Sequence, residues 1–369
     1  MNARTYRRLV AAVATAGLLA TACSSDDVTD DETPDGSESP SEMTSDDPTD
    51  AMTEGMDHSD WPESIVFGFV PSREAEELQD DIQPFVDVLS DALGIEVEGF
   101  VTADYAGLVE AMGAGQADLG AFGPTGYVLA EQRFEIEPLI QSIRFGAATF
   151  HGQFFTNDAS VCSSDPAPGA FAGEGDLVGP TDTVALQVGW NGDDTEEEGI
   201  EPGLACTVDD LAEAVRGRTF AFGSETSTSG FIFPALKLAD LGIDYQSDIE
   251  AIFTGSHDAA VTAVYNGDAD FGVSFDDARR NVRETFADVG SKVIVIDITP
   301  EVPNDVVAVR SELPQSLKDA IYDAVADYLA TEEGATAFDE IYGWTDIRRA
   351  EDAEFDIVRE AVETIGAEE

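Results

Sequence analysis

Two short stretches of this chain resemble one another, and together they indicate the fold class. Residues 110–120 read EAMGAGQADLG, and residues 262–272 read TAVYNGDADFG. Alanine, glycine, alanine, aspartate and glycine coincide at five of the eleven positions, at an offset of 152 residues. Each copy reads as the end of a helix, a glycine that stops it, and a short strand that begins Ala-Asp. Either the likeness arose by chance, or the chain contains two lobes of similar build.

The same alignment, extended backwards, places Tyr105 opposite His257, each near the start of its helix. In open α/β sheets, ligands bind beyond the carboxyl ends of the strands, where helix N-termini point. Two facing lobes would therefore put Tyr105 and His257 on opposite walls of one cleft. An isolated histidine is more often a packed or surface residue, and the alignment is what makes His257 a candidate for binding.

Strands and helices alternate from Trp61 onward, which is typical of an α/β protein. Short apolar strands are expected at 65–70, 95–101 and 117–122. The helix between the first two buries a face that recurs at helical spacing, formed by Leu78, Ile82, Phe85, Leu89 and Leu93. About 310 residues remain after the N-terminal segments, enough for two lobes with cores of their own.

The sharpest local signal is at residues 220–234, which read FAFGSETSTSGFIFP. A short apolar strand leads into a hydroxyl-rich turn, and an apolar helix follows. Ser227, Thr228 and Ser229 can each donate from a hydroxyl, and the first N–H groups of the helix face the same way, where the helix dipole favours an anion. Plain N-capping is the alternative, but a cap needs only one such residue. The pattern predicts an oxyanion cradle of neutral donors, without lysine or arginine.

The first 22 residues are typical of an export signal. Three arginines precede an eleven-residue apolar run at 9–19, which is too short to span a bilayer. The residues before Cys23 read LATA, like a bacterial lipobox, which predicts that Cys23 is lipidated; an ordinary signal peptide with an incidental cysteine is the alternative. Residues 23–60 carry 14 acidic residues and no lysine or arginine, so we expect an acidic, disordered tether.

The charge and the cysteines narrow the classes of partner and site. The chain has 76 acidic and 18 basic residues, a formal net charge of −58, which argues against nucleic acid and anionic membranes as partners. With Cys23 assigned to the lipid, Cys162 and Cys206 form an even pair in an exported chain, and we expect a disulfide between them. The segment between them, about 158–207, reads as a surface insertion. The cysteine spacing does not match a zinc site, and we expect neither metal nor cofactor.

Five motifs carry a resemblance to a known family. They are FGFVPS at 67–72, ADLGAFGP at 117–124 followed by Tyr127, STSG at 227–230, FTGSHDAA at 253–260 and VPND at 302–305. In these motifs, and over residues 65–345 as a whole, the chain resembles the phosphonate-binding family of periplasmic solute-binding proteins, which also includes phosphite and phosphate-type binders. The segment from Asp158 to Cys206 departs from the family pattern because it is longer and more acidic.

The resemblance implies a type II periplasmic-binding-protein fold. Two α/β lobes joined by a hinge would close on a ligand in the cleft between them. We expect lobe 1 at 61–150 plus 300–369, and lobe 2 at 151–299 with the insertion at about 158–207.

The resemblance also implies which residues bind the ligand. They are Tyr105, Tyr127, Ser227, Thr228, Ser229, His257, Asp276 and Asp305. In the family, the hydroxyl triplet and the histidine hold the phosphonate oxygens and the tyrosines complete the wall. Asp276 and Asp305 match acids associated with the other end of the ligand, such as an ammonium group. Asp277 is adjacent to Asp276 and could serve in its place, and either could simply cap a helix.

The function expected from these features is that of an extracytoplasmic, lipid-anchored binding protein of an ABC importer. It would capture a phosphonate, phosphite or phosphate as a monomer and deliver it to a cognate permease, without being an enzyme. A sensory ligand-binding module of the same fold is the first alternative. An exported hydrolase using His257 and a triplet serine is the second, although no serine stands in a G-x-S-x-G nucleophile turn.

Overall fold

The computed structural model describes residues 58–144, 146–163, 165–166, 204–283, 285–286 and 288–366. The expected export signal, Cys23 and nearly all of the tether lie outside the described residues, as does most of the expected insertion. The described residues belong to one compact unit. No helix within the described ranges is long and apolar enough to cross a membrane.

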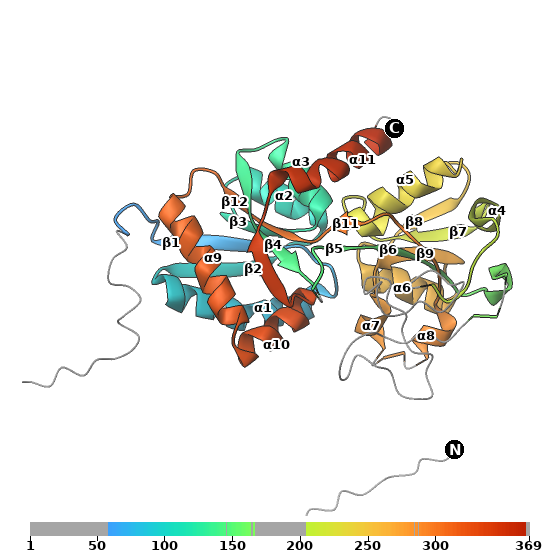
Figure 1. Ribbon diagram of the computed structural model, residues 1–369, viewed down its shortest axis with the longest axis horizontal. Coiled ribbons are helices and arrows are strands. Elements are labelled where there is room, and N and C mark those ends of the chain that lie inside the picture. The colour runs from blue at the N-terminus through green and yellow to red at the C-terminus, as the bar shows by residue number, and fades with distance from the viewer. Residues whose placement is uncertain are drawn as a thin grey trace, which may run out of the picture. The chain divides into compact units, whose positions relative to one another are not determined.

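The first of two large sheets has six strands, in the order β13-β4-β12-β3-β1-β2 (Figure 1). Their bounds are β1 Ser64–Phe69, β2 Glu96–Val101, β3 Leu119–Phe122, β4 Ile136–Ile143, β12 Val306–Arg310 and β13 Asp346–Arg349. β1 runs parallel to both β2 and β3, whereas β12 is antiparallel to β3 and β4. We refer to the part of the molecule built on this sheet as lobe 1.

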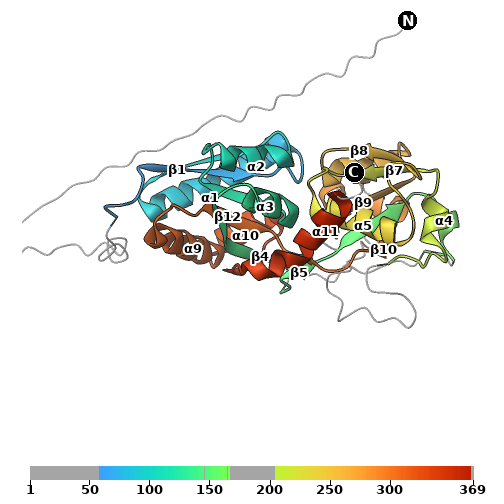
Figure 2. The same ribbon diagram turned by 90° about the horizontal axis from the view of Figure 1, so that it is seen from above.

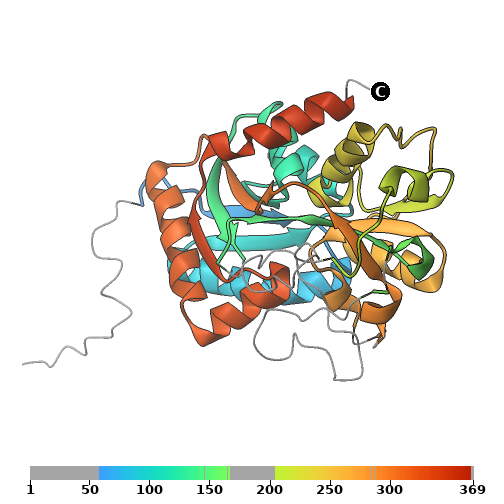
Figure 3. The same ribbon diagram turned by 45° about the vertical axis from the view of Figure 1, so that its right-hand side comes forward.

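Helices bury both faces of the lobe 1 sheet. α1 Ala75–Leu93, α9 Gln315–Leu329 and α10 Glu332–Tyr342 pack on one another, and α2 Tyr105–Gly113 packs on α3 Pro124–Glu131 (Figure 3). Alternate side chains of β12 join different cores: Val307 and Val309 pack in the cluster with α1 and α9, while Val306 and Ala308 pack in the other. A strand with both faces covered in this way reads as a continuous apolar run, as the sequence of β12 does.

The second large sheet has five strands, in the order β10-β6-β9-β7-β8, and defines lobe 2. Its strands are β6 Gly152–Thr156, β7 Thr219–Phe222, β8 Glu250–Phe253, β9 Phe271–Phe275 and β10 Ile294–Ile298. The described part of this lobe contains the helical elements η2 Ala159–Val161, α4 Leu211–Val215, η5 Thr228–Ile232, α5 Phe233–Asp240, α6 His257–Asn266, α7 Arg279–Val282 and α8 Val289–Lys292. β7 is parallel to β8 and β9, and β6 is antiparallel to β9.

The two sheets share one plan. β2-β1-β3-β12-β4 and β8-β7-β9-β6-β10 have the same order and the same pattern of parallel and antiparallel pairs. α2 with β3 and α6 with β9 are the two copies of the sequence repeat. Gly115 and Gly267 take positive φ angles of 67° and 80°, and thus end their helices in a conformation that suits glycine. The predicted helix–glycine–strand units are confirmed.

The lobes are connected by two strands and covered by one shared helix. β5 Thr149–Phe150 and β11 Val302–Pro303 pair antiparallel where the chain passes between the sheets. After β13 and η6 Asp352–Phe355, α11 Asp356–Gly366 contacts α3 of lobe 1 and α5 of lobe 2 (Figure 2). The lobe boundaries predicted at residues 150 and 300 remain a prediction; the strands of each sheet lie within the range given for its lobe.

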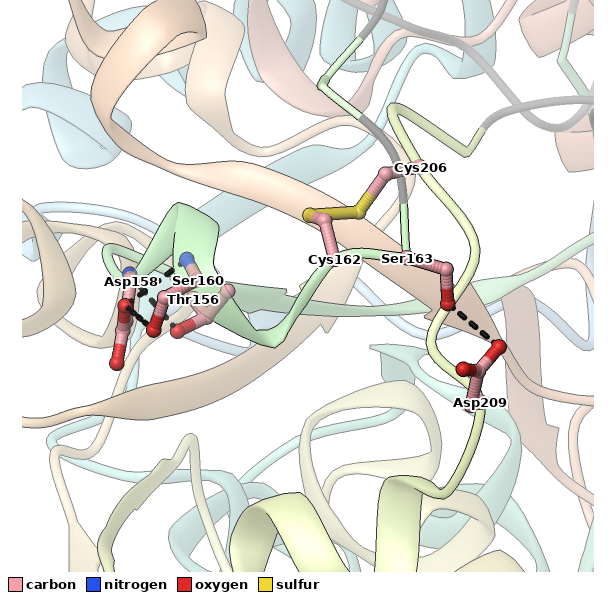
Figure 4. Close-up of a disulfide and its surroundings, with 7 residues drawn as sticks. All are labelled: Thr156, Asp158, Ser160, Cys162, Ser163, Cys206 and Asp209. Atoms are coloured by element: carbon pink, nitrogen blue, oxygen red, sulfur yellow. Dashed lines mark hydrogen bonds between the residues drawn. A yellow bond between two sulfur atoms is a disulfide. The ribbon is translucent and has the colours of Figure 1, made fainter.

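A disulfide joins Cys162 and Cys206 next to the lobe 2 sheet (Figure 4). Just beyond it, the Ser163 hydroxyl donates to Asp209 over 2.6 Å, and the Ser163 N–H donates to the Thr207 carbonyl over 2.8 Å. The two ends of the expected insertion are therefore held together at its base.

Candidate functional site

A cavity of about 410 Å³ lies between the lobes and is lined by residues of both. It sits beyond the carboxyl ends of the parallel strands β1, β3 and β7, where open α/β sheets bind their ligands. Six of the eight predicted ligand-binding residues line it: Tyr105, Ser227, Thr228, Ser229, His257 and Asp305.

The hydroxyl-rich turn forms the lobe 2 wall of this cleft. Thr228–Ile232 is a single π-helical turn that continues into α5, and Ser227 is its N-cap, accepting from the Gly230 N–H over 3.1 Å. The first N–H groups of such a turn have no partner within the helix. A side chain at Gly230 would lie 2.8 Å from the Ser227 hydroxyl oxygen and 3.1 Å from His257 Cε1. Glycine at this position therefore lets the turn approach the histidine.

Thr228 differs from its two neighbours because its hydroxyl proton is already donated within the protein. It accepts from the backbone N–H of Thr125 over 2.8 Å and donates to the Thr125 hydroxyl over 2.9 Å. Thr125 is in the first turn of α3 in lobe 1. Thr228 thus caps a helix of the opposite lobe, and its only hydroxyl proton is used there rather than offered to a ligand.

His257 is the first residue of α6 and is held as a neutral ring. Its pKa is lowered to about 3, because burial disfavours the charged form and Arg144 repels it. The Phe275 N–H donates to Nδ1 over 3.3 Å, which leaves the proton on Nε2, 3.4 Å from the Ser227 hydroxyl. Ser256 fixes the start of the helix by accepting from the Ala259 N–H over 3.2 Å. His257 therefore presents a neutral N–H donor beside the hydroxyl turn.

Tyr105 is the lobe 1 counterpart of His257 and is the first residue of α2, where Asp104 caps the helix. Its pKa is raised by burial and by the nearby carboxyls of Asp305 and Asp258. The phenol therefore keeps its proton and can donate. The pKa of Asp305 is also raised, by burial, with Arg144 opposing the shift. Tyr105 and Asp305 together form a wall on the lobe 1 side.

The two neighbouring aspartates after β9 have different environments. Asp277 forms a buried ion pair with Arg279, whose Nε donates to both carboxylate oxygens over 2.9 and 3.1 Å. Asp276 is also buried, its carboxylate oxygens have no hydrogen bond within the described residues, and burial raises its pKa well above the usual value. Neither aspartate is among the residues that line the cavity. The carboxylate of Asp277 is therefore occupied by its ion pair with Arg279, whereas that of Asp276 is not.

Tyr127 is placed away from the cleft. It is fully buried, packs edge-on against Phe355, and donates from its hydroxyl to Asp352 over 2.7 Å. In this arrangement the side chain ties α3 to the segment that leads into α11.

Three arginines among the described residues line the cavity besides the hydroxyl turn, for which the sequence predicts a cradle of neutral donors. Arg73 pairs with Asp81 and also donates to the Glu340 carbonyl. Arg144 is 7% exposed, and its guanidinium lies 5.0 Å from the Phe275 ring and 5.6 Å from the Phe150 ring. Arg280 lies over the same Phe275 ring at 5.7 Å. The hydroxyls are therefore neutral donors in a cleft that also contains positive charge.

This combination of groups suits the capture of an anion. Neutral O–H and N–H donors bind oxygen atoms by oriented dipoles, and buried cations strengthen any such contact in a medium of low polarity. No group of three or more His, Cys, Asp or Glu side chains that could hold a metal occurs in the described ranges.

Comparison with known proteins identifies a family. Residues 67–355 match a family model described as ABC transporter, phosphonate, periplasmic substrate-binding protein. The Phosphate-import protein PhnD of Mycolicibacterium smegmatis is 25% identical over 283 residues, covering 75% of this chain and 67% of that protein. The Phosphonates-binding periplasmic protein of Escherichia coli is 22% identical over 294 residues, covering 80% and 74%.

Solved structures share the fold. PhnD1 from Prochlorococcus marinus in complex with methylphosphonate gives a TM-score of 0.64 at 18% identity, covering 83% of this chain and 99% of that one. A binding protein component of an ABC phosphonate transporter from Pseudomonas aeruginosa gives 0.62 at 19% identity, covering 81% and 85%. The predicted two-lobed, type II periplasmic-binding-protein fold is confirmed.

Proposed function

Because this chain belongs to the phosphonate-binding family of periplasmic substrate-binding proteins of ABC transporters, we propose that it captures a phosphorus oxyanion in the cleft between its lobes and delivers it to a cognate permease. The ligand is a phosphonate, phosphite or phosphate, and the protein acts by binding and release rather than by catalysis. Cys23 anchors it to the cell membrane through a lipid, and the acidic tether of residues 23–60 spaces it from the surface.

The observation that best supports this proposal is that the first residues of two helices line the same cavity as the hydroxyl turn. Tyr105 and His257, one from each lobe, line the same cavity as Ser227 and Ser229. Each of these four side chains can donate to oxygen, and none carries charge at neutral pH. Donors that converge from two lobes match a tetrahedral oxyanion, which presents oxygens in several directions.

Titration calorimetry on the purified protein tests the proposal, with methylphosphonate, 2-aminoethylphosphonate, phosphite and phosphate as ligands. We expect at least one to bind, and we expect Ser227→Ala or His257→Ala to weaken that binding about tenfold or more, since a hydrogen bond to a charged group is worth about 1.5–3 kcal/mol. Ser291→Ala, a change at an exposed hydroxyl in α8, is the matched control and should leave the affinity unchanged. Failure of every ligand to bind the folded protein would refute the proposal.

A further inference from the structure

Two arginines from opposite lobes converge at one point of the cleft. Arg144 follows β4 in lobe 1, and Arg280 is in α7 of lobe 2. A side-chain carbon placed on Gly343 would lie 2.9 Å from Arg280 Nη2 and 3.7 Å from Arg144 Nη2. Gly343 ends α10 with a φ of 70°, and the absence of a side chain there leaves the two guanidinium groups facing the same space. Like charges brought together in this way repel each other. The pKa of Arg280 is lowered to about 10, mainly by burial and further by repulsion from Arg144.

The Arg144 guanidinium lacks a fixed partner of its own. It lies against Phe275 and Phe150, and it has no hydrogen bond or ion pair with any side chain in the described part of the chain. A buried guanidinium has five N–H donors, and leaving them without acceptors is costly. Arg144 also lines the cavity, so a ligand in the cleft can supply those acceptors.

The acids near these arginines only partly offset their charge. Asp276 and Asp305 both interact electrostatically with Arg144, which opposes the rise that burial causes in the pKa of each, and neither forms an ion pair with it within the described residues. Asp277 is committed to Arg279, and Asp339 faces Arg280 from α10. The Arg144 guanidinium, which has no hydrogen bond or ion pair with a described side chain, therefore remains available to an anion.

We propose that Arg144 and Arg280 form a second anion subsite, so that the cleft prefers phosphonates whose substituent ends in a carboxylate over those whose substituent ends in an ammonium group. The inference rests on the proposed function and specifies its substrate class. The oxyanion end of the ligand lies at Ser227, Ser229 and His257, and its carboxylate lies at the guanidinium pair. Phe275 separates these two ends, because its ring is 4.9 Å from the His257 ring and 5.0 Å from the Arg144 guanidinium. The planar fork of arginine matches the two oxygens of a carboxylate.

Calorimetry with ligands of matched size tests this subsite. 3-Phosphonopropionate and 2-aminoethylphosphonate differ chiefly in the sign of the distal charge, and phosphonoacetate shortens the distance between the two acids. We expect 3-phosphonopropionate or phosphonoacetate to bind at least tenfold more tightly than 2-aminoethylphosphonate. We expect Arg144→Gln to reduce the affinity ratio of the preferred carboxylate ligand to methylphosphonate by tenfold or more.

Two further variants keep the test decisive. Arg133→Gln removes an exposed arginine that pairs with Glu110, and should not change the ratio. If Arg144→Gln does not fold, Arg144→Lys retains the charge without the fork and should lower the ratio to an intermediate value.

The outcomes separate this inference from the proposed function. If methylphosphonate binds and depends on Ser227, but the carboxylate ligands have no advantage over 2-aminoethylphosphonate, the subsite is refuted and the proposed function stands. A ratio that is unchanged in Arg144→Gln refutes it equally. If the folded protein binds none of these ligands, nor phosphite nor phosphate, both fail.

Discussion

The two lobes are built on the same strand plan but present different chemistry to the cleft. In lobe 1, the loop after β1 contributes Ser72 and Arg73, and the arginine is tied to Asp81. At the equivalent junction after β7 in lobe 2, the chain forms the turn of Ser227, Thr228 and Ser229. The same contrast holds at the repeat, where Tyr105 and His257 occupy equivalent helix starts.

This difference teaches that the scaffold and the ligand chemistry are set by separate residues. The alanines, glycines and aspartate that the two repeats share lie in the helix, where it ends and where the following strand begins. Tyr105 and His257, which line the cleft and differ between the lobes, stand at strand-to-helix junctions outside the sheets. The following predictions compare lobe 2 residues with lobe 1, first where their roles should differ and last where they should be the same.

The largest expected effect concerns the buried ion pair between Asp277 and Arg279, which follows β9. At the equivalent junction after β3 in lobe 1, the chain has Gly123 and Pro124 instead. Asp277→Asn should lower the free energy of unfolding by about 3–5 kcal/mol, because it removes the carboxylate that pairs with the buried Arg279 guanidinium. Urea denaturation at neutral pH measures this loss. Asp248→Asn, which breaks the exposed pair with Arg216, should cost about 1 kcal/mol or less. Equal losses in the two variants would show that the buried pair does not support lobe 2.

The next effect is a dependence of stability on pH, which arises from His257 but not from Tyr105. The unfolded histidine binds a proton below its ordinary pKa near 6.5, whereas the folded one does so only below about 3. Stability should therefore fall as the pH drops from about 6.5 towards 3, by about 3 kcal/mol at pH 4 from this group. His257→Gln should remove that part of the slope, and Tyr105→Phe should keep it. Parallel curves for wild type and His257→Gln, from denaturation at several pH values, would contradict the assignment.

A smaller effect is expected from the contact between Thr125 and Thr228, which joins the lobes. Thr228→Val should cost about 1–2 kcal/mol of unfolding free energy, because the buried Thr125 N–H loses its acceptor. Combined with Thr125→Val, the loss should be less than the sum of the two single losses, since both changes break the same contact. A double-mutant cycle measures the coupling, and strictly additive losses would mean that the two residues act independently.

The smallest expected effects are losses of stability on removing a helix cap, and they should be equal in the two lobes. Asp104→Ala and Ser256→Ala each remove the cap of a repeat helix and should each cost about 1 kcal/mol. Both should also weaken ligand binding, because Tyr105 and His257 are the first residues of those helices. Asp210→Ala removes the cap of α4, whose residues do not line the cavity, and should reduce stability while leaving the affinity unchanged. Loss of affinity in Asp210→Ala would mean that the caps act only through stability.

Much of the fold follows from local patterns in the sequence. The repeat places Tyr105 and His257 at helix starts because capping and glycine termination are set by a few adjacent residues. The hydroxyl turn follows in the same way from consecutive residues. By contrast, the π-helical form of that turn and the pairing of Thr228 with Thr125 depend on contacts between distant segments.

Arg144 shows what sequence reasoning missed and why. It lies between β4 and β5 outside any motif, and its neighbours in the cleft come from β9, α7 and the end of α10. Only the fold brings these segments together. One signal was available: the chain has 18 lysines and arginines against 76 acids, and Arg144 lies in the apolar run SIRFGAATF at residues 142–150. A scarce cation within an apolar run is a candidate for a buried role.

The position of α11 has a practical consequence for observing the protein at work. This helix leaves lobe 1 after β13, yet it contacts α5 and the turn η5 that contains the hydroxyl residues. Any hinge rotation that separates the lobes must therefore shift α11 relative to α3 or to α5. Ile357 on this helix is 47% exposed, so a fluorophore attached there would be accessible without disturbing the cleft. A dye at this position would convert lobe movement into an optical signal, and the protein would then serve as a reagentless sensor for its own ligand.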